Sequence, residues 1–131
     1  MLTQDQIQKI EQFFFNQEAI AAVYVFGSTA AGKDRRKSDI DLALILRSPI
    51  DPMKRVEMET ALSNLLRRDV DLVVFDKSSP LLQHQILKYG RLIFEADPAE
   101  RVRQEVYARK AYFDTAHLYR KIKGNAAHGG P

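Results

Sequence analysis

The 131-residue chain contains no cysteine, which excludes disulfide bonds, thiolate metal sites and cysteine nucleophiles. It also lacks any apolar run approaching the roughly eighteen residues of a membrane-spanning helix, so we expect no membrane partner. Its first residues, MLTQDQIQKIEQFF, show no basic stretch followed by an apolar core, which is the pattern of a secretory signal. These absences together predict a cytoplasmic protein.

The composition is that of an ordinary globular protein, with 45% hydrophobic and 28% charged residues. The length matches one domain, because domains most often contain about 100–150 residues. Twenty Lys and Arg against seventeen Asp and Glu leave a formal charge of +3. Nucleic-acid-binding domains usually carry more positive charge, gathered on one face, so direct nucleic-acid binding is not expected.

Capping residues and apolar spacing predict alternating helices and strands. Asp51, Ser79 and Asp97 each precede a proline, a pair that favours the first turn of a helix. Thr3 and Gln6 match a capping box. The predicted helices cover residues 5–15, 52–67, 80–89 and 98–123, and the predicted strands cover residues 22–26, 39–46, 70–75 and 91–94.

This order of elements predicts a single α/β (α+β) domain over residues 1–123. Its core would be a small mixed β-sheet of about four strands with helices packed on it. The strand over residues 39–46 is apolar on both faces beyond its two carboxylates, which indicates a place in the middle of the sheet. Residues 124–131 are small and polar, and we expect a mobile C-terminal tail there.

Two carboxylates stand at the start of that central strand. Asp39 and Asp41 are two residues apart, so their side chains would share one face. Carboxylates held together repel each other unless a cation lies between them. Oxygen ligands without His or Cys favour Mg²⁺, or Mn²⁺ in its place. The simpler alternative is that both aspartates cap a turn at the strand entrance.

A phosphate-binding turn and a third carboxylate accompany this pair. Gly27 would let a phosphate approach the backbone closely, and the N–H groups that begin at Ser28 would form an anion site. Asp69 and Asp71 stand at the start of the next strand and share a face. If the two strands are neighbours, Asp71 could ligate a metal and accept a proton from an incoming hydroxyl. The spacing alone leaves Asp69 open as the third carboxylate.

The set Gly27-Ser28, Asp39-x-Asp41 and Asp71 resembles the nucleotidyltransferases of the DNA polymerase β superfamily. The likeness is closest to the minimal nucleotidyltransferases, and it extends over residues 23–95. Within that range, the segment over residues 80–94, Pro-Leu-Leu-x-x-x-Ile-Leu-x-x-Gly followed by Arg-Leu-Ile-Phe, is also similar to this group. The resemblance implies a polymerase β-like fold.

The family implies two-metal transfer of a nucleoside monophosphate to a hydroxyl, with loss of pyrophosphate. On this pattern Gly27 and Ser28 hold the β- and γ-phosphates of ATP, and Asp39 and Asp41 bind two Mg²⁺ ions. Asp71 binds the catalytic metal and activates the acceptor. Many minimal members act as antitoxins that add AMP to a tyrosine of a HEPN-type ribonuclease toxin, so the resemblance implies such a toxin as partner.

Two alternatives remain open at the level of sequence. The chain could be an antitoxin that neutralises its partner by binding and masking it, without needing catalysis. It could also be an oligomeric nucleotidyltransferase that modifies a small molecule at a subunit interface. Relatives that modify other acceptors carry a second domain that binds the acceptor, and this chain has no residues left for one. We therefore expect the acceptor to be a protein that brings its own binding surface.

The remaining signals are less specific. The basic segment over residues 33–37 could meet a triphosphate or a partner, or could be a solvated turn, and His84, His117 and His128 show no metal-ligand spacing. The last predicted helix carries two apolar stripes on opposite sides, of which one is enough to dock it on its own sheet. The second stripe would be covered by another layer of the chain or by a partner protein. The stripes are Val102, Val106, Phe113 and Ala116 on one side, and Tyr107, Ala111, Leu118 and Ile122 on the other.

Overall fold

The computed structural model describes residues 2–27 and 39–129, with side chains described as far as Ile122. The strands in this part of the chain are β1 (Ile20–Phe26), β2 (Ile40–Leu46), β3 (Val70–Val74) and β4 (Arg91–Glu95). The helices are α1 (Gln4–Phe15), α3 (Pro52–Leu66), α4 (Pro80–Tyr89) and α5 (Pro98–Gly129), and a short 3-10 helix, η1 (Phe75–Lys77), follows β3. Each predicted helix and strand is therefore confirmed, within a few residues at its ends except at the C-terminal end of α5.

The predicted capping residues start the helices. Thr3 and the glutamine three residues later form both hydrogen bonds of a capping box at α1. The side chain of Asp51 accepts a hydrogen bond from the Met53 amide, 2.8 Å away, at the start of α3. Ser79 caps α4 in the same way, and Asp97 accepts from the third amide of α5. The starts of these helices could be predicted from the sequence because a capping hydrogen bond is made within one turn.

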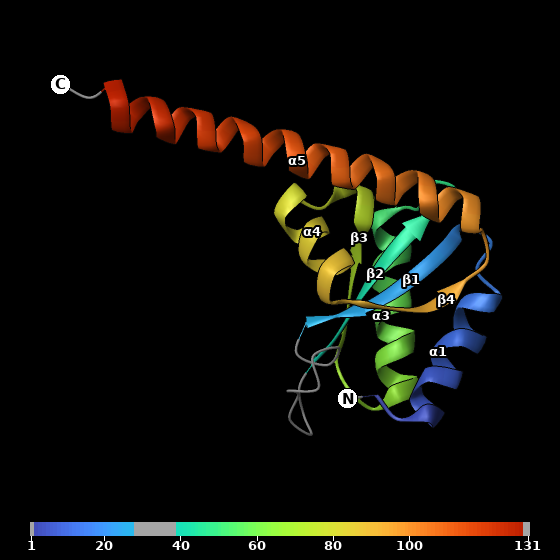
Figure 1. Cartoon of the computed structure of the whole chain (residues 1–131). Helices are drawn as coiled ribbons and strands as arrows, with labels where there is room; N and C mark the ends of the chain where they lie inside the picture. The colour runs from blue at the N-terminus through green and yellow to red at the C-terminus, as the bar shows by residue number, and fades with distance from the viewer. Residues whose placement is uncertain (1, 28–38, 130–131) are drawn as a thin grey trace.

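The four strands form one mixed sheet in the order β3-β2-β1-β4. β1 pairs antiparallel with both β2 and β4, whereas β2 pairs parallel with β3. β2 therefore has a neighbour on each side, as its two-sided apolarity predicted. Figure 1 shows the sheet between two pairs of helices, which confirms the expected mixed sheet with helices packed on it.

The two faces of the sheet carry separate hydrophobic clusters. On the face covered by α1 and α3, alternate residues of the central strands, among them Val23, Leu42 and Leu44, pack against Phe14 and Leu62. The opposite face is covered by α4 and α5 and has smaller side chains from the sheet. Its buried cluster comprises Ala21, Ala22, Tyr24, Ala43, Ile45, Phe75, Ile86 and Ala108.

α5 docks on the sheet through polar residues. Among the described side chains of α5, those of Gln104, Glu105 and Ala108 are buried. The Tyr24 hydroxyl of β1 donates a hydrogen bond to the Glu105 carboxylate, which also pairs with Arg101 at 2.8 Å. Burial is the main cause that raises the pKa of Tyr24 above its usual range, and the nearby Glu105 carboxylate raises it further. The hydroxyl therefore stays protonated and can donate the hydrogen bond.

Neither apolar stripe of α5 is the docking face. The side chains of Val106 and Phe113 on one stripe are 58% and 63% exposed, and Leu118 and Ile122 on the other are 58% and 60% exposed. The expectation that an apolar stripe holds α5 on its own sheet is therefore wrong. The physical reason is the buried network of Tyr24 and Glu105, whose mutual hydrogen bond compensates for the burial of polar groups at this interface.

α5 is longer than predicted and reaches well beyond the body of the molecule (Figure 1). It continues to Gly129 rather than ending near Lys123, so residues 124–129 of the predicted tail are helical. The mobility of that tail stays a prediction, and residues 130–131 lie outside the described residues. None of the helices described, including α5, is both long and apolar enough to cross a membrane.

Candidate active site

Asp41 and Asp71 lie directly opposite each other where β2 and β3 begin. They are register partners in the parallel pair. Their neighbours Leu42 and Leu72 belong to the core under α1 and α3, so the two carboxylates project from the other face of the sheet. A hydrogen bond of 2.8 Å from the Ile40 amide to the Asp69 carbonyl joins the two strands at this end.

Electrostatic repulsion links the three predicted carboxylates. Burial raises the pKa of Asp41 above its ordinary value, and the negative charges of Asp71 and then Asp39 raise it further. Asp41 is half-buried, whereas Asp39 and Asp71 are exposed. Asp69 does not act on Asp41 in this way. Asp41 and Asp71 are therefore paired at one end of the sheet, and Asp39 lies near enough for its charge to act on Asp41.

Gly27 lies against the Asp41 carboxylate. It follows β1 directly, and the last residue of that strand, Phe26, is the register partner of Asp41. The φ angle of Gly27 is +75°, a conformation that residues with a side chain rarely adopt. A Cβ atom at this position would lie 2.5 Å from the Oδ2 atom of Asp41. Glycine is therefore favoured here by backbone conformation, and a larger residue would also force the Asp41 carboxylate to move.

We expect Gly27→Ala to destabilise the protein by at least about 1–2 kcal/mol, because a left-handed backbone is costly for a residue with a Cβ. A second contribution comes from the contact with Asp41. In an Asp41→Ala background that contact is gone, so the same glycine substitution should cost less. Urea unfolding of the four proteins measures both values. Equal costs in the two backgrounds would show that Gly27 is not constrained by the carboxylate.

The other residues that the sequence singled out are not seen at the carboxylate end of the sheet. Ser28 and the basic segment over residues 33–37 lie outside the described residues. His84 is on α4, where its ring stacks on Tyr112 at 3.8 Å between centroids. His117 stacks on Phe113 within α5, and the side chain of His128 is not described.

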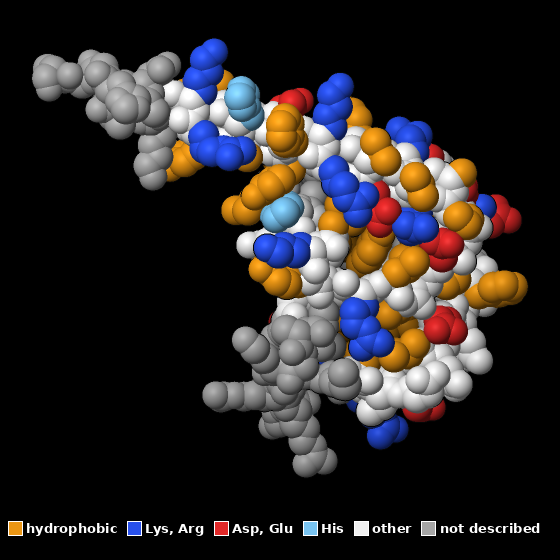
Figure 2. Space-filling model, in the orientation of Figure 1, with side chains coloured by type: hydrophobic (Ala, Val, Ile, Leu, Met, Phe, Trp, Pro, Cys, Tyr) orange, Lys and Arg blue, Asp and Glu red, His pale blue; other side chains and the backbone are white. Residues whose placement is uncertain are grey.

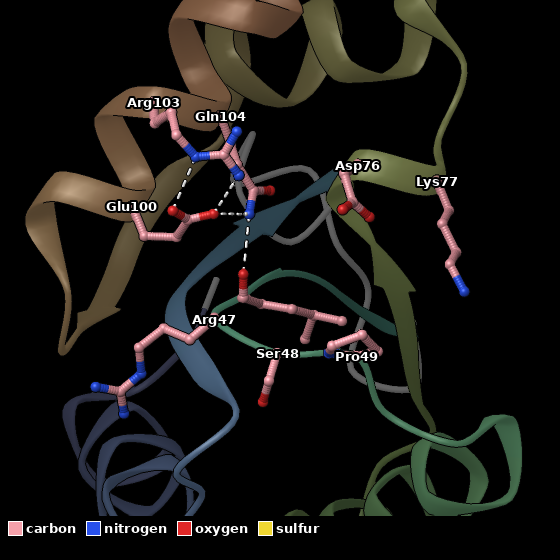
Figure 3. A pocket seen from close by; sticks show the side chains of 9 residues that line it. Arg47, Ser48, Pro49, Asp76, Lys77, Glu100, Arg103 and Gln104 are labelled. Atoms are coloured by element: carbon pink, nitrogen blue, oxygen red, sulfur yellow. Dashed lines mark hydrogen bonds and ion pairs between the residues drawn. The ribbon is translucent and has the colours of Figure 1, made fainter.

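A cavity of about 170 Å³ at the other end of the sheet is one feature that the sequence did not indicate (Figure 3). The Gln104 amide donates to the Leu46 carbonyl and to Glu100, both at 2.9 Å. Hydrogen bonds from Arg103 and Gln104 lower the pKa of Glu100 to about 2. Leu46 is five residues along β2 from Asp41, roughly 17 Å in a strand, so this cavity is separate from the carboxylates. Only tertiary packing brings these residues together, and no sequence spacing signals it.

The chemistry of the carboxylate end fits a divalent cation. Its donors are oxygen atoms only, which suits Mg²⁺ or Mn²⁺. The pKa of Asp41 is raised first by burial and then by the negative charges of Asp71 and Asp39, and a cation would offset those charges. Within the described residues, no three acidic or histidine side chains converge closely enough to enclose a metal ion by themselves.

Comparisons with known proteins bear on this arrangement. A family model for the polymerase beta nucleotidyltransferase domain matches residues 8–99, which include Gly27 and all three carboxylates. The protein adenylyltransferase MntA of Shewanella oneidensis is 33% identical over 103 residues, which make up 79% of this chain and 71% of the relative.

Solved structures match the fold over almost the whole chain. A chain from a crystal structure of a toxin–antitoxin complex with AMP-PNP is 25% identical, with a TM-score of 0.76, and the match covers 96% of this chain and 99% of the other. A chain from the complex of a tri-AMPylated Shewanella oneidensis HEPN toxin with its MNT antitoxin is 23% identical, with a TM-score of 0.75 and the same coverage. The family match covers more than half of the chain, and the homology to MntA agrees with it: this chain belongs to the polymerase β nucleotidyltransferase family.

Proposed function

We propose that this chain is an antitoxin that transfers AMP from ATP to a tyrosine hydroxyl of a HEPN-type ribonuclease toxin. The observation that carries the proposal is the register pair of Asp41 and Asp71, with Gly27 against the Asp41 carboxylate. The homology to a protein adenylyltransferase and the fold shared with a toxin–antitoxin complex holding an ATP analogue support the donor and the class of acceptor. With ATP as donor, we expect the reaction to take place in the cytoplasm.

Each residue has a separate task in this reaction. Gly27 and Ser28 would bind the β- and γ-phosphates, because a glycine with φ of +75° leaves room for a phosphate at the backbone. Asp39 and Asp41 would hold two Mg²⁺ ions, with Asp71 as a further ligand of one of them; Mn²⁺ could replace either ion. These ions would supply charge neutralisation for the triphosphate and the leaving group.

Asp71 would also accept the proton of the acceptor hydroxyl. The hydroxyl oxygen then forms a bond to the α-phosphorus of ATP, and the bond from that phosphorus to the bridging oxygen breaks. Pyrophosphate leaves with the electron pair, and the tyrosine carries AMP. The exposure of Asp71 supports this role, because a general base must be reachable by the group that it deprotonates.

The direct test is the intact mass of the HEPN-type partner, co-purified with this chain, before and after addition of ATP and Mg²⁺. We expect the partner to gain one or more AMP groups, and we expect no gain when EDTA replaces Mg²⁺. A stable complex whose partner gains no mass with any of the four nucleotides would contradict the proposal.

A masking antitoxin is the second candidate, and the exposed stripes of α5 favour it because they could bind a partner without chemistry. The double variant Asp39→Asn, Asp41→Asn separates the two. For a catalytic antitoxin, we expect the double variant to bind the toxin but to leave its ribonuclease activity unrestrained in the presence of ATP. If the double variant inhibits the ribonuclease as well as the wild type does, masking is the mechanism.

A further inference from the structure

The part of α5 that extends beyond the body of the molecule is an exposed surface with an unusual content of large apolar side chains. From Phe113 onward, Leu118, Tyr119 and Ile122 are all about 60% exposed. Figure 2 shows hydrophobic side chains along this extension and a hollow beneath it, between the helix and the body. Helices in proteins gain most of their stability from packing, so burial of these apolar residues by a partner would stabilise the extension.

A groove begins where the extension leaves the body. It has a volume of about 630 Å³ and is lined by His84 of α4 and by residues of α5 that include Tyr112, Phe113 and Tyr119. The stacked rings of His84 and Tyr112 join the two helices at its base. The groove therefore has a packed aromatic base, and Phe113 and Tyr119 stand exposed beside it, which suits an inserted helix.

The groove and the carboxylates are on the same side of the sheet, because Asp41 and Asp71 project from the face that α4 and α5 cover. α4 contributes His84 to the groove and ends at Tyr89, just before Gly90, where an added Cβ would lie 3.1 Å from the Val25 carbonyl of β1. Val25 precedes Gly27 by two residues. The six residues from His84 to Gly90 span about 9 Å of helix, so the groove is within reach of a protein whose hydroxyl approaches Asp71.

The charge of the extension indicates the chemistry of its occupant. Between Arg109 and Ile122 the exposed charged residues are Arg109, Lys110, Arg120 and Lys121, against Asp114 alone. A second copy of this chain would bring the same excess of positive charge to the interface, which disfavours self-association there. A partner with acidic residues beside an apolar stripe would be attracted.

We propose that the α4–α5 groove is the docking site of the acceptor protein, which inserts an amphipathic helix with an acidic rim. This inference rests on the proposed function, because it identifies how the same active site obtains its protein acceptor. Phe113 and Tyr119 are the apolar anchors, and Arg109 and Arg120 pair with acidic residues at the rim. The docked protein then presents its tyrosine across α4 to the carboxylate end of the sheet.

The test measures binding of the purified HEPN-type partner to full-length variants of this chain without ATP, by titration calorimetry. Phe113→Glu combined with Tyr119→Glu should weaken binding by at least about 30-fold, as expected for loss of central apolar anchors. Leu118→Glu is the matched control: Leu118 is on the same extension and similarly exposed, but it does not line the groove. We expect it to change the affinity by less than about threefold. Circular dichroism and thermal unfolding of each variant check that the fold is retained.

Three outcomes would overturn the docking proposal: unchanged binding of the groove variant, an equal loss for Leu118→Glu, or a homodimer of the wild-type chain that the groove variant dissociates in sedimentation experiments. The two proposals fail separately. If the partner binds through the groove but gains no AMP, the proposed function is wrong and the docking site stands. If the partner gains AMP but the groove variant binds it normally, only the docking site is wrong.

Discussion

Asp41→Asn is expected to lower the rate of AMP transfer by more than about 100-fold. Loss of a residue that only supports a metal ligand typically costs 10–100-fold, and Asp41 would contact the metal itself. Asparagine keeps the shape of the side chain and removes its charge, so the loss isolates the electrostatic role. The rate is measured as AMP incorporated into the partner at saturating ATP and Mg²⁺. An Asp41→Asn variant within tenfold of the wild type would contradict the assignment.

The same substitution should stabilise the metal-free protein, and this gives a readout that does not depend on activity. Like charges opposite each other on neighbouring strands cost roughly 0.2–1 kcal/mol, so we expect the melting temperature to rise by up to about 5 °C at neutral pH in EDTA. The pKa of Asp41 is raised in the folded state, so stability falls as the pH rises from the ordinary value of 3.8 to the raised pKa, and the full cost is present above that pKa. The advantage of the variant should therefore disappear as the pH falls below the ordinary value of 3.8.

Added Mg²⁺ should make the wild type more stable than Asp41→Asn, the reverse of the order expected in EDTA. A cation between the carboxylates would stabilise the folded wild type, whereas the asparagine variant has lost one ligand. Melting curves of both proteins with and without Mg²⁺ measure the effect. Equal responses of the two proteins to Mg²⁺ would show that Asp41 is not a ligand, whatever its effect on the rate.

The local elements of this fold could be predicted from the sequence because their signals are local. Asp51 and Ser79 cap helices through hydrogen bonds made within the first turn. The spacing of Asp39 and Asp41 predicted that their side chains share a face, since a strand repeats every two residues. The candidate carboxylates followed from the same spacing, together with a family pattern.

The long-range arrangement could not be predicted in the same way. Asp41 faces Asp71 because β2 pairs parallel with β3. The sequence did not show that these strands are neighbours, so the role of Asp71 was predicted only on the condition that they are. The docking face of α5 was predicted wrongly because apolar spacing carries no information about a buried polar pair such as Tyr24 and Glu105. These two residues are far apart in the chain, and only the folded sheet brings them together.

Substitution of Asp69 and of Asp71, at the start of β3, should have very different effects on kcat for AMP transfer. Asp71→Asn should lower kcat for AMP transfer by about 10²–10⁴-fold, the usual contribution of a general base. Asp69→Asn is the matched control and should change kcat by less than about threefold. The reason is positional, because Asp71 faces Asp41 in register and raises its pKa, whereas Asp69 precedes the strand.

Both variants remove one carboxylate and leave an amide in its place, so a difference between them cannot come from the change in net charge. The carbonyl of Asp69 still accepts the Ile40 amide in the control, since that bond uses the backbone. Binding of ATP, measured by titration, should change little in either variant, which places the loss for Asp71→Asn in the transfer step rather than in donor affinity. If Asp69→Asn instead shows the larger loss of kcat, the third carboxylate of the site is Asp69, and the partner's hydroxyl approaches from beyond the start of β3.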